Sequence, residues 1–247
     1  MTQNILIVGA TSGIAQAVAR RYAAEGCRFF LAARNAARLD LVANDLAVRG
    51  ASKIDTFIMD ANDLDSVPRM LDAAWTALAK VDVALVAHGT LPDQKRTETD
   101  LAYAIAEFRT NAESVIVCLV SLAMKFKSQG RGTIAVIGSV AGDRGRASNY
   151  LYGSAKAAVD VYVSGLRAQM FKLGVHVLTI KPGFVATPMT VGLNLPKILT
   201  ASPDKVAKDI QIAISKRKDI LYTPWFWVLI MWVIRYIPGP IFKRLGF

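Results

Sequence analysis

Cysteine and histidine are scarce in this chain of 247 residues, which contains only two of each. Cys27 and Cys118 lie in apolar stretches, so we expect buried free thiols in a reducing compartment and no disulfide framework. His88 and His176 are far apart, which argues against a zinc centre. The sequence therefore predicts no metal site.

Acidic residues are also in short supply, because 19 Asp and Glu face 30 Lys and Arg, for a net charge of +11. That balance suits a phosphate-bearing ligand, nucleic acid or an anionic membrane surface, although a basic solvated surface would look the same. No Lys/Arg run is interleaved with aromatic residues and no known nucleic-acid-binding module occurs, so we expect no nucleic-acid partner.

The chain has no internal repeat, no low-complexity segment and no interdomain linker. Its first apolar strand begins by Ile5, which leaves no room for a signal peptide, so a cytoplasmic location is expected. We predict one domain over residues 1–224, followed by an apolar and basic C-terminal extension over residues 225–247.

Short apolar runs alternate with helical segments along this domain, which predicts an α/β fold with a parallel sheet covered on both faces. Ligands bind such a sheet at the carboxyl ends of its strands. The expected strands are Asn4–Val8, Arg28–Ala33, Ile54–Met59, Val81–Ala87, Thr133–Ile137, Val175–Ile180 and Asp219–Thr223. The expected helices are 16–24, 36–49, 66–79, 98–128, 152–173 and one that begins after the cap residue Ser202.

A glycine-rich turn, GATSGIA, lies between the first strand and the first helix. Gly9 permits the tight turn, and Gly13 lets the backbone approach a pyrophosphate at the helix N-terminus. Ala15 stands where a third glycine is usual, and the Gly-x-x-x-Gly-x-Ala spacing differs from the commoner fingerprint. A turn that holds no ligand is the alternative.

Charged residues follow the second and third strands directly. Arg34 can hold a ribose 2′-phosphate, where an acidic residue would select NAD, and Arg38 adds charge one helical turn later. A solvated arginine at a strand end is the alternative. Asp60 is expected either to bind an adenine amino group or to cap the next helix.

The stretch NYLYGSAK places Tyr152 and Lys156 four residues apart, on one face of a helix. An ammonium group beside a phenol is expected to lower the phenol's pKa and make it a better proton donor. Ser139 ends the fifth strand, and Asn111 lies mid-helix among apolar neighbours. Each feature alone can arise by chance or for structural reasons, so their joint order along the chain matters more.

That order resembles the short-chain dehydrogenase/reductases over about residues 4–224. The motifs that carry the resemblance are GATSGIA, Asp60, His88-Gly89, Asn111, Ser139, Tyr152-x-x-x-Lys156 and Pro182-Gly183. The resemblance implies a Rossmann-type doubly wound sheet of seven parallel strands, an NADP(H)-dependent oxidoreductase, and a homodimer or homotetramer formed through the helices that carry Asn111 and Tyr152.

The resemblance also implies roles for individual residues. Tyr152 would be the general acid–base, Ser139 would hydrogen-bond the substrate oxygen, and Asn111 would hold a water of the proton relay. Lys156 would hold the nicotinamide ribose and lower the pKa of Tyr152. The implied cofactor contacts are Gly9, Thr11, Ser12, Gly13, Ile14, Arg34, Arg38, Asp60, His88, Gly89, Tyr152, Lys156, Pro182, Gly183, Val185 and Thr187.

The chain departs from the family pattern where Val86-Ala87-His88-Gly89 replaces Asn-Asn-Ala-Gly. His88 therefore replaces a small residue near the cofactor. A packed strand-end histidine is the favoured interpretation over a catalytic one.

The C-terminal extension begins with ten consecutive apolar residues, Trp225–Ile234. Two cations, Lys243 and Arg244, lie close to its C-terminal end. It is too short to cross a bilayer, which needs about 20 apolar residues. It suits a segment that lies on the inner face of the membrane, with Lys216–Lys218 adding attraction to anionic lipid; packing on the core or in an oligomer is the alternative.

Residues 184–200 are mostly apolar, as expected of a flexible lid that covers a hydrophobic ligand. With the tail, they resemble more weakly the decaprenyl-phosphoryl-2-keto-ribose reductases. A hydrophobic or polyprenyl-linked ketone such as a keto-sugar is therefore expected as substrate. A 3-ketoacyl chain or a sterol-like ketone is the alternative, as is a non-catalytic NADP-binding scaffold.

Overall fold

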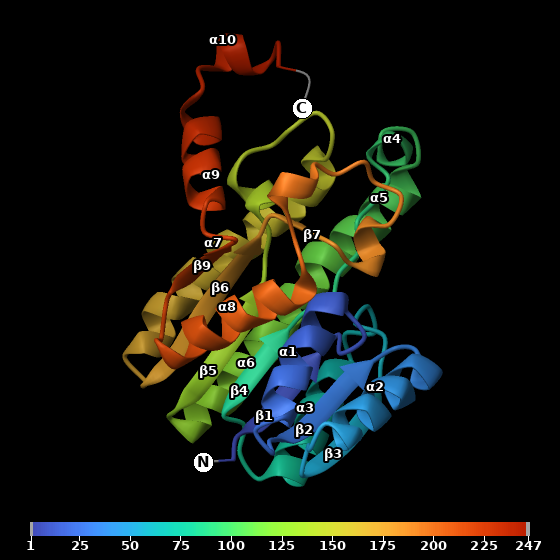
Figure 1. Cartoon of the computed structure of the whole chain (residues 1–247), viewed down its shortest axis with the longest axis vertical. Coiled ribbons are helices and arrows are strands. Elements are labelled where there is room, and N and C mark those ends of the chain that lie inside the picture. The colour runs from blue at the N-terminus through green and yellow to red at the C-terminus, as the bar shows by residue number, and fades with distance from the viewer. Residues whose placement is uncertain (1, 246–247) are drawn as a thin grey trace.

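The computed structural model describes residues 2–245 and contains a sheet of seven parallel strands with helices on both faces (Figure 1). The strand order is β3-β2-β1-β4-β5-β6-β9, which confirms the predicted Rossmann-type doubly wound fold. The strands are β1 (Asn4–Val8), β2 (Arg28–Ala33), β3 (Lys53–Ile58), β4 (Val83–Val86), β5 (Gly132–Ile137), β6 (Val175–Pro182) and β9 (Ile220–Thr223).

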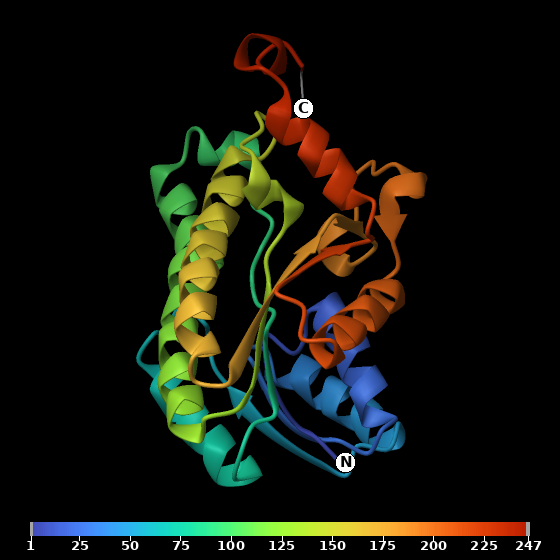
Figure 2. The same ribbon diagram turned by 90° about the vertical axis from the view of Figure 1, so that its left-hand side faces the viewer.

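Helices cover both faces of the sheet, as Figure 2 shows. The α-helices of the described chain are α1 (Gly13–Ala23), α2 (Ala36–Val48), α3 (Ser66–Leu78), α4 (Gln94–Thr97), α5 (Leu101–Phe108), α6 (Ser114–Gln129), α7 (Tyr150–Phe171), α8 (Pro203–Ser215), α9 (Trp227–Tyr236) and α10 (Gly239–Phe242). Successive strand side chains point to opposite faces, so Ile5 and Ile7 pack with α1, α2 and α8, and Leu6 and Val8 pack with α3, α6 and α7. This two-sided burial explains the continuous apolar strands.

The strand order reverses between β1 and β4, and the chain leaves these two neighbours toward opposite edges of the sheet. A doubly wound sheet opens a crevice at such a point, outside the carboxyl ends of the strands. A cavity lined by residues that follow these strands lies there.

The segment expected as one helix over 98–128 is interrupted. It consists of α5, a π-helical turn at Arg109–Glu113, and α6, and a short helix α4 precedes it. Asn111 lies in the π-helical turn, a widened geometry that often marks functional sites. Helices α1 and α7 begin three and two residues earlier than predicted, at Gly13 and Tyr150.

The expected lid, residues 184–200, is held at both ends. Strand β7 (Phe184–Val185) pairs in parallel with β8 (Thr200–Ala201), and two short 3₁₀ turns lie between them, Pro188–Thr190 and Lys197–Leu199.

Cys27 and Cys118 are buried free thiols, as predicted.

The C-terminal extension folds as α9 and α10 at the end of the molecule where the strands terminate (Figures 1 and 2). The inner face of α9 buries Trp227 and Met231 against Val140, and the Trp227 ring meets Phe184 edge-on at 5.1 Å. Arg144 donates hydrogen bonds to the carbonyls of Ile234 and Ile237 and lies above the Phe242 ring. The extension therefore packs on the core through one of its faces.

The opposite face of α9 is also apolar, and it is exposed. Its side chains recur every three or four residues: Val228, Leu229, Trp232, Val233 and Tyr236, and the exposed Trp225 lies just before the helix. A helix that is apolar all round is normally buried on every side, in a protein core or in lipid. Within residues 2–245, no helix combines the length and apolar character needed to cross a bilayer.

Candidate active site

The glycine-rich turn joins β1 to α1 and shapes one end of the cavity. Gly9 has φ +85°, and a Cβ there would lie 2.5 Å from the backbone nitrogen of His88, so both conformation and packing require glycine. Ser12 occupies the N-cap position of α1, but its side chain makes no capping hydrogen bond. The first N–H groups of α1 therefore remain open for an anion, which fits a pyrophosphate.

Two arginines line the same end of the cavity. Arg34 and Arg38 are exposed, and neither has an ion-pair partner within residues 2–245. Asp60 also lines the cavity and accepts a hydrogen bond from the Asn62 backbone at 2.9 Å. It does not cap α3, whose N-cap position belongs to Asp65, so the capping alternative is wrong. Free guanidinium groups beside an open helix terminus fit a dinucleotide that carries an extra phosphate.

His88 follows β4 and lines the cavity beside this end. Its Nε2 lies 3.1 Å from the Ser114 hydroxyl, which in turn donates to the Thr110 carbonyl. Because that hydroxyl has only one hydrogen, Nε2 of His88 must be the donor in the pair. Its Nδ1 is then a buried acceptor without a partner among residues 2–245. Burial, together with the charge of Lys156, lowers the pKa of His88 to about 4, so the ring is neutral at pH 7 and a poor general acid.

Asn111 joins the loop after β4 to the helical layer. Its Oδ1 accepts from the Thr90 backbone at 3.0 Å, and its Nδ2 donates to the Thr90 hydroxyl and to the Glu107 carbonyl. A Cβ at Gly89 would lie 2.8 Å from this Oδ1 and 3.6 Å from the amine of Lys156. The structure thus brings Asn111 close to Lys156, and its role in holding a water stays a prediction.

The opposite wall of the cavity brings Ser139, Tyr152 and Lys156 together. Ser139 follows β5 and hydrogen-bonds Tyr152 on α7. Lys156 projects from the same face of α7, donates to the Ile137 carbonyl at 3.2 Å, and lies 5.7 Å from the centre of the Tyr152 ring. The i, i+4 spacing produces this neighbourhood, as expected from the sequence.

Burial dominates the electrostatics of this pair. It raises the pKa of Tyr152 to about 12, against a smaller lowering by the Ser139 hydrogen bond. The expectation that Lys156 holds the pKa of Tyr152 below 10 is therefore wrong for this structure. Lys156 is itself buried, which lowers its pKa to about 8, while the charge of Asp160 raises it in part. Desolvation opposes the charged form of both groups.

Sequence reasoning missed a buried charge network behind this wall. Lys181 contacts Asp143 at 2.6 Å and Asp160 at 2.7 Å, and the Tyr222 hydroxyl donates to Asp143 at 2.8 Å. The network links the loop after Ser139 to α7, β6 and β9. A lysine inside the fully buried strand β6 was the available signal, because buried lysines are almost always paired.

Pro182-Gly183 and the start of the lid close the cavity on its third side. A Cβ on Gly183 would lie 1.9 Å from the Trp227 indole, so this contact with the C-terminal extension requires glycine. Val185 is buried, and Thr187 packs against Gly13, with 3.1 Å between its Cγ2 and an ideal Cβ there. The lid thus rests on the start of α1.

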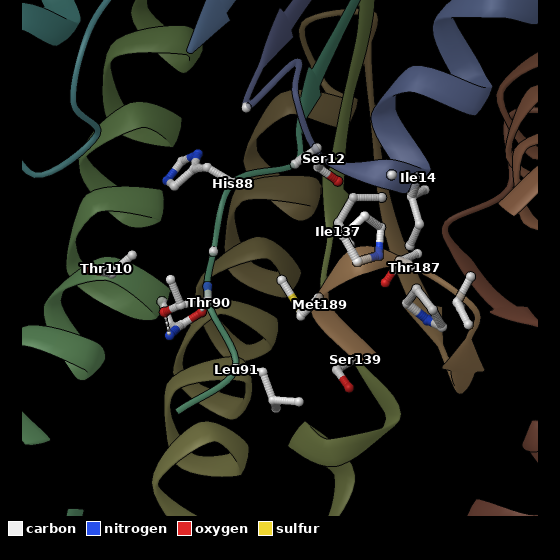
Figure 3. A pocket seen from close by; sticks show the side chains of 18 of the residues that line it. Ser12, Ile14, His88, Thr90, Leu91, Thr110, Ile137, Ser139, Thr187 and Met189 are labelled. Atoms are coloured by element: carbon white, nitrogen blue, oxygen red, sulfur yellow. Dashed lines mark hydrogen bonds between the residues drawn. The ribbon is translucent and has the colours of Figure 1, made fainter. Parts of the chain in front are cut away.

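The cavity that these elements enclose has a volume of about 440 Å³, and its wall includes Thr11, Ile14 and the other expected cofactor residues. In Figure 3, Ser12 and Ile14 lie at one end, while Ser139 and Leu91 lie at the other. The cavity wall also includes apolar side chains and two polar residues that the sequence did not single out. These are Leu91, Met189, Leu193 and Leu195, with Arg146 and Asn149.

Comparisons with known proteins agree with this geometry. The chain is 36% identical over 241 residues to an uncharacterised oxidoreductase of Mycobacterium tuberculosis, which covers 98% of this chain and 96% of that protein. It is 33% identical over 244 residues to an uncharacterised oxidoreductase of Streptomyces coelicolor, with the same two coverages.

Solved structures share the fold. A variant of actinorhodin polyketide ketoreductase with NADPH superposes with a TM-score of 0.82 at 21% identity, over 92% of this chain and 97% of that one. Levodione reductase gives 0.81 at 20% identity, over 90% and 95%. The family model described as short chain dehydrogenase matches residues 3–197. The chain therefore belongs to the short-chain dehydrogenase family of oxidoreductases.

Proposed function

We propose that this protein is an NADPH-dependent reductase that converts a hydrophobic or lipid-linked ketone, such as a keto-sugar, to an alcohol. The observation that carries the proposal is one cavity with Ser139, Tyr152 and Lys156 on one wall and unpaired arginines at its other end. A non-catalytic NADP-binding scaffold would need the arginines but not the hydroxyl, phenol and amine together.

The residues divide the work of reduction among them. Bound NADPH supplies the hydride that adds to the carbonyl carbon. Tyr152 donates its phenolic proton to the carbonyl oxygen as negative charge develops there, and Ser139 donates a hydrogen bond to the same oxygen. The ammonium of Lys156, with its pKa below that of Tyr152, can return a proton to the phenolate. Neutral His88 takes no part in this transfer.

The cofactor preference follows from Arg34 and Arg38. We expect Arg34→Asp to weaken NADPH binding about 10–100-fold, because one charge-assisted contact to the 2′-phosphate is lost and a repulsive charge is added. NADH binding should be unchanged or stronger. Titration of both cofactors by fluorescence measures the change. Arg131→Asp, which makes the same charge reversal on an exposed residue away from the cavity, is the control. Equal loss of both cofactors would contradict NADP selection.

The pH dependence follows from Lys156. Tyr152 keeps its proton up to about pH 12, so Lys156 limits the reaction as it loses its charge above about pH 8. We expect kcat/KM for reduction to be level below pH 8 and to fall above it, whereas a lysine in water titrates near 10.4. Initial rates from pH 6 to 10 test this. A profile that stays level to pH 10 would refute the role given to Lys156.

A membrane-borne substrate is supported by the exposed face of α9. Six apolar side chains, two of them tryptophans, are exposed there, counting Trp225 just before the helix. Residues 220–247 contain no Asp or Glu, whereas Arg235, Lys243 and Arg244 are cationic. Aromatic side chains with flanking cations are typical of segments that lie in the interface of an anionic bilayer, and such cations would repel a second copy of the same face.

Vesicle binding tests this surface. The double variant Trp225→Glu and Trp232→Glu should lower the affinity for vesicles containing phosphatidylglycerol at least about tenfold. Burial of each aromatic ring in the bilayer contributes more free energy than a tenfold change in affinity requires. Val48→Glu changes an exposed apolar residue on α2 and should have no effect. If the double variant instead dissociates a dimer in vesicle-free solution, the face binds a second copy and the membrane proposal is wrong.

Oligomerisation through the helices that carry Asn111 and Tyr152 is part of the proposal. Exposed apolar side chains on these helices support it, among them Leu101, Ile105, Val120, Met124 and Val161. Light scattering after gel filtration should give the mass of two or four chains. The mass of a single chain would contradict oligomerisation through this surface.

A further inference from the structure

We propose that Arg146 and Asn149 recognise an anionic oxygen group, a phosphate or a carboxylate, on the substrate beside its ketone. The inference rests on the proposed function, because it concerns the substrate half of the same cavity. It names a chemical class that the apolar lid and tail do not reveal.

The position of Arg146 separates it from the cofactor's phosphates. It lies on the loop between Ser139 and Tyr152, the two residues whose hydroxyl groups meet at the wall that receives the carbonyl oxygen. The residues that fit the pyrophosphate and the 2′-phosphate belong to β1, α1 and the end of β2, on the other side of the switch point. A group bound by Arg146 would therefore belong to the substrate half of the cavity.

Arg146 has no partner of its own. It lines the cavity, its Nε is buried, and that atom makes no hydrogen bond within residues 2–245. Asp143 is the carboxylate that acts on it, but both oxygens of Asp143 are taken by Lys181 and Tyr222. A partly buried cation without a counter-ion is unfavourable unless a ligand supplies the charge.

Arg144, two residues earlier, shows the contrast. Its guanidinium is committed to the carbonyls at the end of α9 and to the face of Phe242. The loop thus carries two arginines in different environments: Arg144 is bound to the protein, and Arg146 is open to the cavity. This difference makes Arg144 a matched control for Arg146.

Asn149 supplies the second observation. It precedes α7 and occupies the N-cap position, yet its side chain caps nothing. Its Oδ1 is buried and has no partner within residues 2–245, although the residue lines the cavity. An unpaired acceptor three residues after a free guanidinium, on the wall of the same cavity, fits a ligand that offers both a hydroxyl donor and an anionic acceptor.

Apolar side chains also line the cavity, with Leu91, Leu193 and Leu195 as examples. The site therefore suits an amphiphile: a ketone with an acidic oxygen group and a hydroxyl nearby, attached to an apolar portion. A lipid-linked phosphate and a water-soluble phosphate present the same group to Arg146, so both are included in the test.

Matched ketones that differ only in the acidic group provide the test. We expect the wild type to prefer the phosphorylated or carboxylated member, and Arg146→Gln to lower kcat/KM for that member about 10–100-fold while sparing the neutral one. Arg146→Lys should retain part of the preference. Arg144→Gln should affect both members alike. A lipid-linked and a water-soluble phosphate, assayed in parallel, show which source is favoured.

Binding without turnover separates this inference from the proposed function. With the cofactor site saturated by NADP⁺, inorganic phosphate should raise the melting temperature of the wild type but not of Arg146→Gln. A phosphate-induced rise in melting temperature without reduction of any ketone would contradict the proposed function and still support the anion subsite. Phosphate shifts that are equal in the two proteins, or losses that are equal for neutral and acidic ketones, would overturn the subsite.

Discussion

Tyr152→Phe should abolish ketone reduction, with a loss of about 10²–10⁴-fold or more, while NADPH binding stays within about twofold of the wild type. The substitution removes only the hydroxyl that donates the proton. Its ring remains in the cavity wall near Lys156, so the cavity keeps its shape. Steady-state kinetics with a ketone panel and a fluorescence titration of NADPH measure the two quantities.

Tyr150→Phe is the matched control for this variant. Tyr150 begins the same helix but is exposed, and four residues after it stands Ser154 rather than a lysine. We expect it to keep wild-type activity. Wild-type turnover by Tyr152→Phe would transfer the acid role to another group and reject the mechanism.

Lys181→Met should destabilise the fold by about 3–5 kcal/mol, because it leaves two buried carboxylates without their counter-ion. Asp143 and Asp160 converge on Lys181 at 2.6 and 2.7 Å, and the side chain of Asp143 is only 2% exposed. Chemical denaturation at pH 7, with the free energy of unfolding extrapolated to water, measures the loss.

The same variant has a predicted pH signature. Burial already raises the pKa of Asp160, and removing the lysine raises it further above its unfolded value. The folded state then binds protons more tightly than the unfolded state, so the stability deficit should shrink as pH falls from 7 toward 5. Lys205→Met breaks an exposed pair with Asp209 and should cost less than about 1 kcal/mol. A deficit independent of pH would contradict the buried-network explanation.

Much of the fold was predictable because its signals are local. Strands such as β2 are short apolar runs whose ends coincide with the expected Arg28–Ala33. Their parallel order then places every residue that follows a strand at one edge of the sheet, which is why Arg34 and Ser139 line one cavity.

The errors and omissions depend on tertiary burial, which no local pattern encodes. The pKa of Tyr152 is set by how deeply α7 sits against the sheet, and spacing to Lys156 says nothing of that depth. Arg144 and Arg146 look equivalent in sequence. They differ only in the folded chain, where α9 packs close enough to accept hydrogen bonds from Arg144 and Arg146 Nε has no partner within residues 2–245. The π-helical turn around Asn111 likewise has no distinct residue signature.

The contact between Gly183 and Trp227 has an evolutionary consequence. Gly183 does not adopt a left-handed backbone conformation, so packing against the indole is what excludes a side chain there. A mutation that places even a methyl group at 183 must wait for, or be followed by, loss of the tryptophan. Among descendants of this chain, the two positions should therefore change together, and lineages that shed the C-terminal helix are released from this constraint.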